Sequence, residues 1–161
     1  MQKFYFGIGS KDNMTSLDPR AQTFLHWALY RSPVDFSVIE GYRDKELQDF
    51  YYRTGASQLR YPNSEHNITN AEGEPASLAF HLLPAPSKLP IQGYDIWKDR
   101  ERLTYLAGII VGLGAAYAET VTGVHGIRFG GDWDSDGILN RWDKHKLDDL
   151  THYELVVKQG D

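Results

Sequence analysis

The sequence predicts an α+β fold in which helices pack on a small antiparallel sheet. Two observations lead to this expectation: apolar residues recur at helical spacing in long stretches, and short apolar runs bounded by glycine or proline are typical of strands. The chain has 161 residues, 41% of them hydrophobic, which is enough to bury a core. No repeat, low-complexity tract or long linker divides it, so we expect a single domain spanning residues 1–161.

Helices are expected at residues 15–31, 44–53 and 99–120. Asp18 is a suitable N-cap for the first helix, and Pro19 suits the first helical position because its missing N–H does no harm there. Gly55 follows the second helix at the usual C-terminal position. The third helix carries small residues that would let neighbouring elements approach closely; they are Ala107, Gly108, Gly112 and Gly114.

Strands are expected at residues 34–40, 76–83, 127–129 and 151–158. Phe36 and Val38 would share one face of the first strand, and Pro84 would end the second. Residues 58–75 form a polar segment, and residues 89–98 form a loop interrupted by proline and glycine.

The composition argues against several classes of protein. Cysteine is absent, so a metal ion could be bound only through histidine and carboxylate side chains. The net charge of −5 argues against nucleic-acid binding. The uncharged run between Arg102 and Glu119 is shorter than the ~20 residues that span a bilayer, so we expect no membrane insertion. The N-terminal apolar run is too short for a signal peptide. We expect a soluble monomer made in a cytoplasm.

Three of the six histidines are expected to bind a metal ion: His66, His81 and His152. Each is expected at the edge of a strand or within one, and ligands on adjacent strands can converge on one ion. His81 lies in an otherwise apolar strand, where an unpaired imidazole would be costly. Asp149 lies three residues before His152, and a carboxylate beside the metal can accept a proton from the attacking water. Nothing around the remaining histidines indicates a ligand; they are His26, His125 and His145.

Three motifs together resemble the M15 group of zinc peptidases: Ser64-x-His66, the run from residue 79 to 84 around His81, and Asp149-x-x-His152-Tyr153-Glu154. That group includes D-alanyl-D-alanine carboxypeptidases and dipeptidases, and the L-alanyl-D-glutamate endopeptidases of phage lysins. Segments 35–43 and 128–134 match the phage-type members. The resemblance covers residues 6–155 and implies the M15 architecture, which D-Ala-D-Ala peptidases and hedgehog-like domains share.

The resemblance implies that His66 and His152 bind Zn²⁺ and that Asp149 is the catalytic base. It also implies that Ser64 and Arg43 lie in the cleft, with Arg43 placed to bind a carbonyl or carboxylate of the substrate. Glu154 or a backbone carbonyl is expected to orient one of the imidazoles.

The third ligand departs from the family pattern. His81 stands where the family normally has aspartate; Glu72 and Glu74 are alternative ligands, but the sequence around His81 aligns better. Three neutral imidazoles would leave the site with a formal charge of about +2. We expect a more acidic bound water and weaker zinc retention in mild acid, because imidazoles with a pKa near ~6.5 must all stay unprotonated.

Residues 132–143 follow the pattern of the EF-hand calcium loop, with a glycine for the sharp turn. The oxygen donors would be Asp132, Asp134, Asp136, Asn140 and Asp143. Asp143 is shorter than the usual glutamate, so weak binding is expected, and an acidic surface turn is the alternative. The loop ends just before Asp149, so Ca²⁺ could order the segment that carries the base.

Together with the candidate ligands, the resemblance implies a zinc-dependent peptidase of peptidoglycan stem peptides: a phage endolysin with L-alanyl-D-glutamate endopeptidase activity. It would stay in the host bacterial cytoplasm until lysis and then reach the periplasm and cell wall. One alternative is a D-Ala-D-Ala carboxypeptidase of wall maintenance, which would normally need a signal peptide. Another is a calcium-binding wall-recognition module without catalysis, which would have no need of Asp149.

Overall fold

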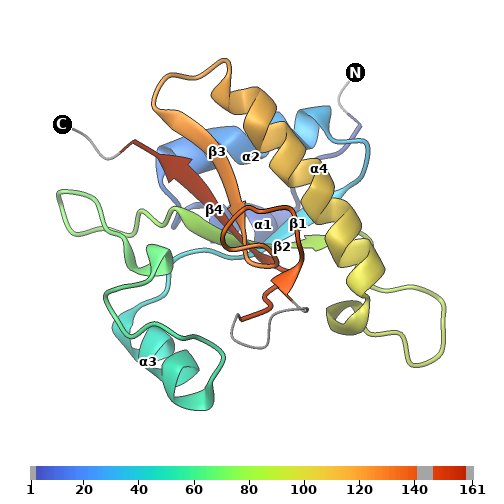
Figure 1. The fold of residues 1–161 in the computed structure, drawn as a ribbon, viewed down its shortest axis with the longest axis horizontal. Helices are drawn as coiled ribbons and strands as arrows, with labels where there is room; N and C mark the ends of the chain where they lie inside the picture. The colour runs from blue at the N-terminus through green and yellow to red at the C-terminus, as the bar shows by residue number, and fades with distance from the viewer. Residues whose placement is uncertain (1–2, 141–146, 159–161) are drawn as a thin grey trace.

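The computed structural model describes residues 3–140 and 147–158. Its centre is a four-stranded antiparallel sheet in the order β1-β2-β4-β3, which confirms the predicted α+β class (Figure 1). The strands are β1 (Phe36–Glu40), β2 (Ala79–Pro84), β3 (Val124–Phe129) and β4 (His152–Val157). The central pair, β2 and β4, brings together segments about 70 residues apart, with His81 opposite His152.

The two faces of the sheet have different chemistry. Side chains alternate along each strand, so Phe80 of β2 and Tyr153 of β4, which are paired across the strands, lie on the same face. Both are fully buried, and Phe129 of β3 packs on Tyr153 from the same side, with ring centroids 5.3 Å apart. The opposite face carries His81, His152 and the cross-strand pair of Glu154 with Arg128. One face is therefore the core, and the other carries the polar groups of the site.

The helices are α1 (Ile8–Met14), α2 (Pro19–Arg31), α3 (Lys45–Thr54) and α4 (Arg100–Ala118). Helix α4 crosses the sheet against β3 and also contacts α2, while α1 lies against β1 (Figure 1). Gly114 makes the contact of α4 with β3 possible, because a Cβ there would meet the side chain of Ile127 at 2.5 Å. Helices α2 and α4 thus close the core.

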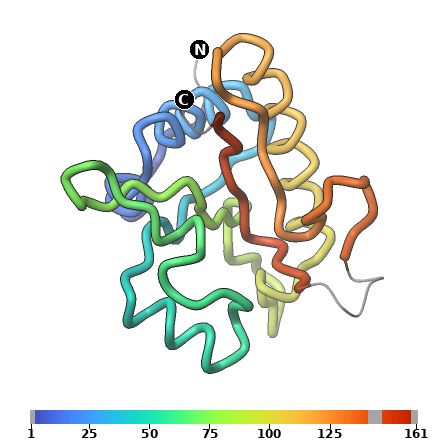
Figure 2. The backbone as a smooth tube through the Cα atoms, turned by 60° about the vertical axis from the view of Figure 1, so that its left-hand side comes forward, coloured from blue at the N-terminus to red at the C-terminus, as the bar shows by residue number. Residues whose placement is uncertain are grey.

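Helix α3 lies apart from these helices. In Figure 2 the segment that contains it, coloured cyan to green, forms a lobe beside the sheet. Asp44 caps its first turn by accepting a hydrogen bond from the Leu47 backbone N–H at 2.9 Å, and Gly55 ends it in the left-handed conformation, as predicted. Gln48 is fully buried and donates to the carbonyl of Leu59 at 2.7 Å, which fixes the following loop against the helix.

Several details differ from the sequence-based expectations. Helix α1 was not predicted: it has only seven residues, and only Ser10 and Met14 of them are buried, so it shows little periodicity. The next helix begins at Pro19 and not at residue 15, with Asp18 as its N-cap as expected. Two short 3₁₀ helices, η1 (Glu65–Asn67) and η2 (Ile96–Lys98), lie in segments expected to be loop. In α4, Gly108 and Gly112 face open space and make no close contact.

In the part of the chain that the structure describes, no helix has the length and apolar character needed to cross a membrane.

Candidate metal centre

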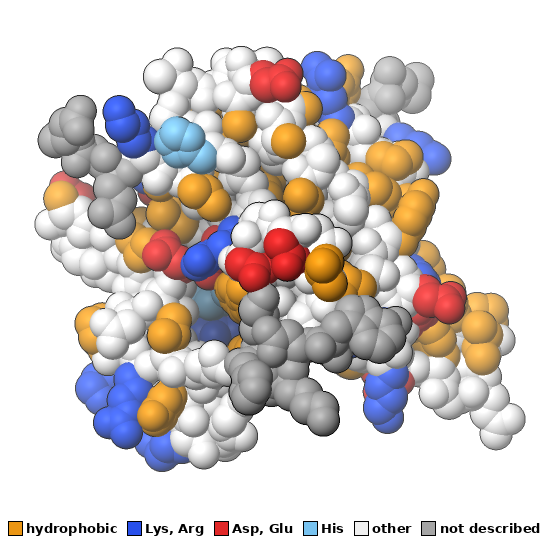
Figure 3. All heavy atoms as spheres, in the orientation of Figure 1, with side chains coloured by type: hydrophobic (Ala, Val, Ile, Leu, Met, Phe, Trp, Pro, Cys, Tyr) orange, Lys and Arg blue, Asp and Glu red, His pale blue; other side chains and the backbone are white. Residues whose placement is uncertain are grey.

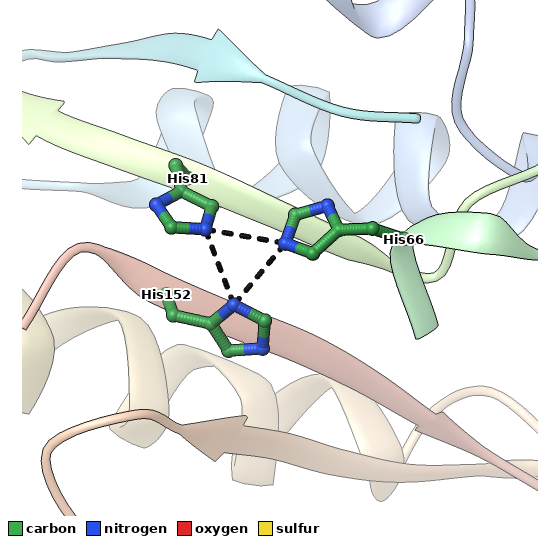
Figure 4. Close-up of side chains that lie close together, drawn as sticks. All are labelled: His66, His81 and His152. Atoms are coloured by element: carbon green, nitrogen blue, oxygen red, sulfur yellow. Dashed lines mark hydrogen bonds between the residues drawn. The ribbon is translucent and has the colours of Figure 1, made fainter. Parts of the chain in front are cut away.

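Three imidazole rings converge on the polar face of the sheet (Figure 4). His81 projects from β2 and His152 from β4, directly opposite one another. His66 comes from η1 and not from a strand, which corrects the expectation that all three lie on or beside strands. His66 Nε2, His81 Nε2 and His152 Nδ1 form a triangle in which each pair of nitrogens is 3.2 Å apart. All three residues are buried.

Local hydrogen bonds hold η1 at the site. The Ser64 hydroxyl accepts from the His66 backbone N–H at 3.3 Å, and the Asn67 side chain accepts from the Ser64 backbone N–H at 3.1 Å, which completes a capping box. Asn67 Nδ2 donates to the Arg43 carbonyl at 2.9 Å, and the Arg43 N–H donates to the His66 carbonyl at 2.8 Å. The turn that carries His66 is therefore joined to the segment that follows β1.

The outward-facing nitrogen of each ring has a partner of its own. The Gly41 carbonyl accepts from His66 Nδ1 at 2.5 Å, and Glu154 Oε1 accepts from His152 Nε2 at 2.8 Å. Both partners are acceptors only, so the outer nitrogens carry the protons and the inner nitrogens present lone pairs. The His81 Nδ1 lies 2.8 Å from the Thr151 hydroxyl. Both expected kinds of partner are therefore present: Glu154 orients the His152 ring, and the Gly41 backbone carbonyl orients the His66 ring.

Burial also keeps two of these rings, His66 and His81, neutral. It is the main cause that holds the pKa of His66 and of His81 well below the usual value, and the nearby positive charge of Arg43 lowers both further. For Glu154, burial alone would raise the pKa, but hydrogen bonds and charge from His152 and Arg128 outweigh it and leave the pKa below its usual value. An ionised Glu154 therefore lies beside the His152 ring.

The triangle fits a metal ion. Tetrahedral zinc with Zn–N distances of ~2.0–2.1 Å places its nitrogens roughly 3.3–3.4 Å apart, close to the 3.2 Å found here. Lone pairs crowded at this distance repel one another unless a cation lies between them. The alternative ligands Glu72 and Glu74 are exposed and are not part of this cluster, in which His81 provides the third nitrogen. The cluster could hold a metal ion without any rearrangement of the strands.

Charged side chains surround the cluster. Arg43 Nη2 lies 3.0 Å from His81 Nε2, while its Nε donates to Glu40 Oε1 at 2.5 Å. The guanidinium also lies over the ring of Tyr51, 4.6 Å from its centroid, and Tyr51 donates to Glu40 at 3.2 Å. Asp149 Oδ2 lies 4.0 Å from His81 Nε2. A carboxylate and a guanidinium are therefore both within reach of a group bound at the imidazoles.

Two cavities meet at the cluster. One of 520 Å³ lies on the side of His81, and one of 360 Å³ lies on the side of His66 and His152. Arg43 and Asp149 line both, and Ser64 lines the second. Figure 3 shows acidic and basic side chains close together around a hollow on this face. The volumes are in the range of ligand-binding clefts, so an extended substrate could lie across the three imidazoles.

The acidic loop lies next to the site. Asp132, Asp134 and Asp136 come close enough together to share a cation. Asp132 accepts from the backbone N–H groups of Asp136 at 3.1 Å and Gly137 at 3.0 Å, which gives the loop a tight turn. Asn140 is buried and donates to the Gly130 carbonyl at 3.1 Å, and Asp143 lies outside the described residues.

The sequence did not single out two residues of the site, Glu40 as the partner of Arg43 and Thr151 as the partner of His81. The register of β2 against β4, which brings Thr151 next to His81, is a long-range feature with no local pattern. Of the histidines with no expected role, His26 and His125 are exposed, and His145 lies outside the described residues.

The fold and the imidazole cluster define a candidate metal-dependent hydrolase. Residues 2–156 match the protein family described as "Phage L-alanyl-D-glutamate peptidase". The chain belongs to this family, and it is a peptidase. It is 28% identical over 153 residues to the L-alanyl-D-glutamate peptidase of Escherichia phage T5, covering 95% of this chain and 98% of that protein. The L-Ala D-Glu endopeptidase ChiX of Serratia marcescens has a similar fold, with a TM-score of 0.63 and 21% identity, covering 94% of this chain and 90% of that chain.

Proposed function

We propose that this protein is a zinc-dependent endopeptidase that hydrolyses the L-alanyl-D-glutamate bond of peptidoglycan stem peptides. The observation that carries the proposal is the triangle of three inward-facing imidazole nitrogens, with Asp149 between the two cavities. Family membership and the phage T5 relative support the bond and the substrate.

Zinc is the ion that we propose for this donor set. Neutral imidazoles suit zinc as well as copper, iron and nickel, but three protein ligands with an open fourth position are typical of catalytic zinc sites. When bound, the ion would polarise the scissile carbonyl and make the attacking water more acidic. His66, His81 and His152 would hold it.

The remaining roles belong to side chains around the cluster. Asp149 takes a proton from the attacking water and passes it to the leaving amine. Arg43 is placed at the junction of the two cavities, where it can bind the carbonyl or a carboxylate of the substrate. Arg43 Nη2 lies 3.0 Å from His81 Nε2, so a cation held by the imidazoles would compete for that lone pair and the guanidinium would turn towards the cleft. Ser64 lines the cavity beside His66 and contacts the substrate there.

The phage relative favours an endolysin that acts on the host wall during lysis. It would remain in the host cytoplasm until a separate lysis protein gives it access to the periplasm.

Digestion of purified peptidoglycan, with fragments identified by mass spectrometry, tests the proposal. Cleavage between L-alanine and D-glutamate leaves L-alanine on the glycan and releases peptides with a free D-glutamate amine. A zinc chelator should abolish this release, and added zinc should restore it. Asp149→Asn should lose turnover yet retain zinc. Release of D-alanine alone would indicate the carboxypeptidase, and binding without cleavage would indicate the wall-recognition module; either result contradicts the proposal.

We also propose that Ca²⁺ binds the acidic loop and orders the neighbouring segment of the site. The clustered carboxylates of Asp132, Asp134 and Asp136 favour it. Trp133, within the same loop, packs against His152 with ring centroids 4.9 Å apart and donates to the Leu147 carbonyl at 2.7 Å. Ca²⁺ that orders the loop would therefore fix Trp133 against the ring of His152.

Peptidase rates measured at fixed zinc, with and without a calcium-selective chelator, test this second proposal. The rate should fall when calcium is removed, and Asp136→Asn should reduce the response. Glu119→Gln, an exposed charge change elsewhere, is the control. Rates that do not respond to calcium while zinc is retained would contradict it.

A further inference from the structure

The hydroxyl of Thr151 lies between the third imidazole and the carboxylate of Asp149. Thr151 Oγ1 is 2.8 Å from His81 Nδ1 and 3.1 Å from Asp149 Oδ1. The backbone N–H of Thr151 reaches the same carboxylate oxygen at 3.3 Å. Thr151 is 6% exposed, so water competes little for these contacts.

The protons of this chain can be assigned from the donors and acceptors present. A hydroxyl has one proton to donate, and an ionised carboxylate can only accept. The Thr151 proton therefore points to Asp149 Oδ1, and the hydroxyl oxygen accepts the proton of His81 Nδ1. His81 Nε2 is then left with its lone pair facing the cluster. The opposite tautomer would place an N–H on Nε2 against the Arg43 donor, which lies 3.0 Å away.

The same contacts give the two carboxylate oxygens of Asp149 different surroundings. Oδ1 of Asp149 is held by the hydroxyl and the backbone N–H of Thr151. Oδ2 is the oxygen 4.0 Å from His81 Nε2, on the side of the imidazole cluster. Thr151 thereby keeps one oxygen occupied and leaves the other directed towards the place where the attacking water must lie.

We propose that Thr151 is a positioning residue that sets the tautomer of His81 for metal binding and, through the same hydroxyl, the orientation of Asp149 for proton transfer. This inference rests on the proposed zinc peptidase activity. The outer nitrogens of His66 and His152 are held by Gly41 and Glu154, neither of which contacts Asp149 through a described hydrogen bond. Thr151 supplies the third such contact and connects the metal ligands to the base.

Thr151→Val removes the hydroxyl at nearly constant volume, and Thr151→Ser retains it. The zinc dissociation constant is measured by competition with a chromophoric chelator, and kcat and KM on a stem-peptide substrate at saturating zinc. For Thr151→Val we expect zinc binding about 10- to 100-fold weaker, as for loss of other groups that orient a metal ligand. We also expect kcat to fall roughly tenfold with KM little changed, because the base is misdirected and not the substrate. Thr151→Ser should restore both values, and the visible spectrum of the cobalt-substituted serine variant should match that of wild type.

Controls separate this proposal from general damage and from the proposed function itself. Thr122→Val alters an exposed threonine far along the chain from the site and should change neither value. If Thr151→Val disturbs folding, Thr151→Ala, which also lacks the hydroxyl, takes its place in the comparison with Thr151→Ser. Wild type that neither binds zinc nor cleaves would overturn the proposed function. Suppose instead that wild type both binds zinc and cleaves. A Thr151→Val variant equal to wild type, or a Thr151→Ser variant as impaired as Thr151→Val, would then overturn the role of Thr151 alone.

Discussion

Replacing Glu154 by glutamine tests how the cluster is held together. The carboxylate is 9% exposed and accepts on both oxygens: Oε1 from His152 Nε2 at 2.8 Å and Oε2 from Arg128 Nε at 2.7 Å. An amide has only one accepting oxygen, so glutamine can satisfy one of these donors and must turn its NH₂ group to the other. If the NH₂ group faces His152, the ring must move its proton to Nδ1, where the metal would bind.

The expected magnitude follows from these contacts. A hydrogen bond to a charged group contributes about 1.5–3 kcal/mol and a neutral one about 0.5–1.5 kcal/mol, so loss of the charge alone costs about 1–1.5 kcal/mol. That loss weakens zinc binding about tenfold. If the amide turns its NH₂ group to His152, the loss of zinc affinity approaches roughly 100-fold, the upper limit for groups that hydrogen-bond the outer nitrogen of a metal-binding histidine.

The assay is chelator competition for zinc, run as a double-mutant cycle with Arg128→Ala. If the NH₂ group of the single variant faces His152, removing Arg128 leaves the amide oxygen free to face His152 instead, and the double variant should bind zinc more tightly than Glu154→Gln alone. Glu101→Gln, an exposed glutamate on α4, carries the same charge change and should bind zinc like wild type. A Glu154→Gln dissociation constant within twofold of the Glu101→Gln value, or a roughly 100-fold loss that the double variant does not relieve, would contradict this prediction.

Three further outcomes are expected. The metal-free protein should lose stability as the pH falls below ~6.5: the pKa values of His66 and His81 are lower in the folded state, so the unfolded chain binds more protons there. Urea unfolding measures the free energy of unfolding at pH 7.5 and 5.5, and the exposed-residue control His125→Gln should show the same fall between the two. An equal free energy of unfolding at both pH values would count against neutral buried imidazoles. Gly130→Ala should destabilise the fold by about 1–3 kcal/mol, because its Cβ would meet the Asp149 carbonyl at 2.4 Å, whereas Gly112→Ala, with open space around it, should stabilise by about 0.5–1 kcal/mol. Zinc retention at pH 5 should be weaker in wild type than in His81→Asp, because three imidazoles must stay unprotonated in the wild type, and equal retention would argue against His81 as a ligand.

The sequence predicted which three histidines lie together better than it predicted the elements that carry them. Short motifs around His66, His81 and His152 carry the chemistry, and each remains recognisable without knowledge of the fold. The 3₁₀ turn of His66 escaped prediction because three residues have no periodicity; its shape depends on capping by Ser64 and Asn67. The contacts of Thr151 and Glu40 depend on pairing between distant segments, which no local pattern encodes.

Burial changes the pH at which the imidazoles are expected to take up protons. Weaker zinc retention in mild acid was expected from imidazoles with their reference pKa near ~6.5. Burial and the charge of Arg43 hold the pKa values of His66 and His81 well below that value. Protons therefore begin to compete for these two nitrogens at a lower pH than the sequence alone suggested.

The proposed activity requires one zinc ion among His66, His81 and His152. Anomalous diffraction from zinc-loaded crystals, recorded on both sides of the zinc absorption edge, can locate such an ion. We expect one strong peak ~2.0–2.1 Å from His66 Nε2, His81 Nε2 and His152 Nδ1. A cluster without a peak at full zinc loading, or a peak that His81 does not reach, would contradict it.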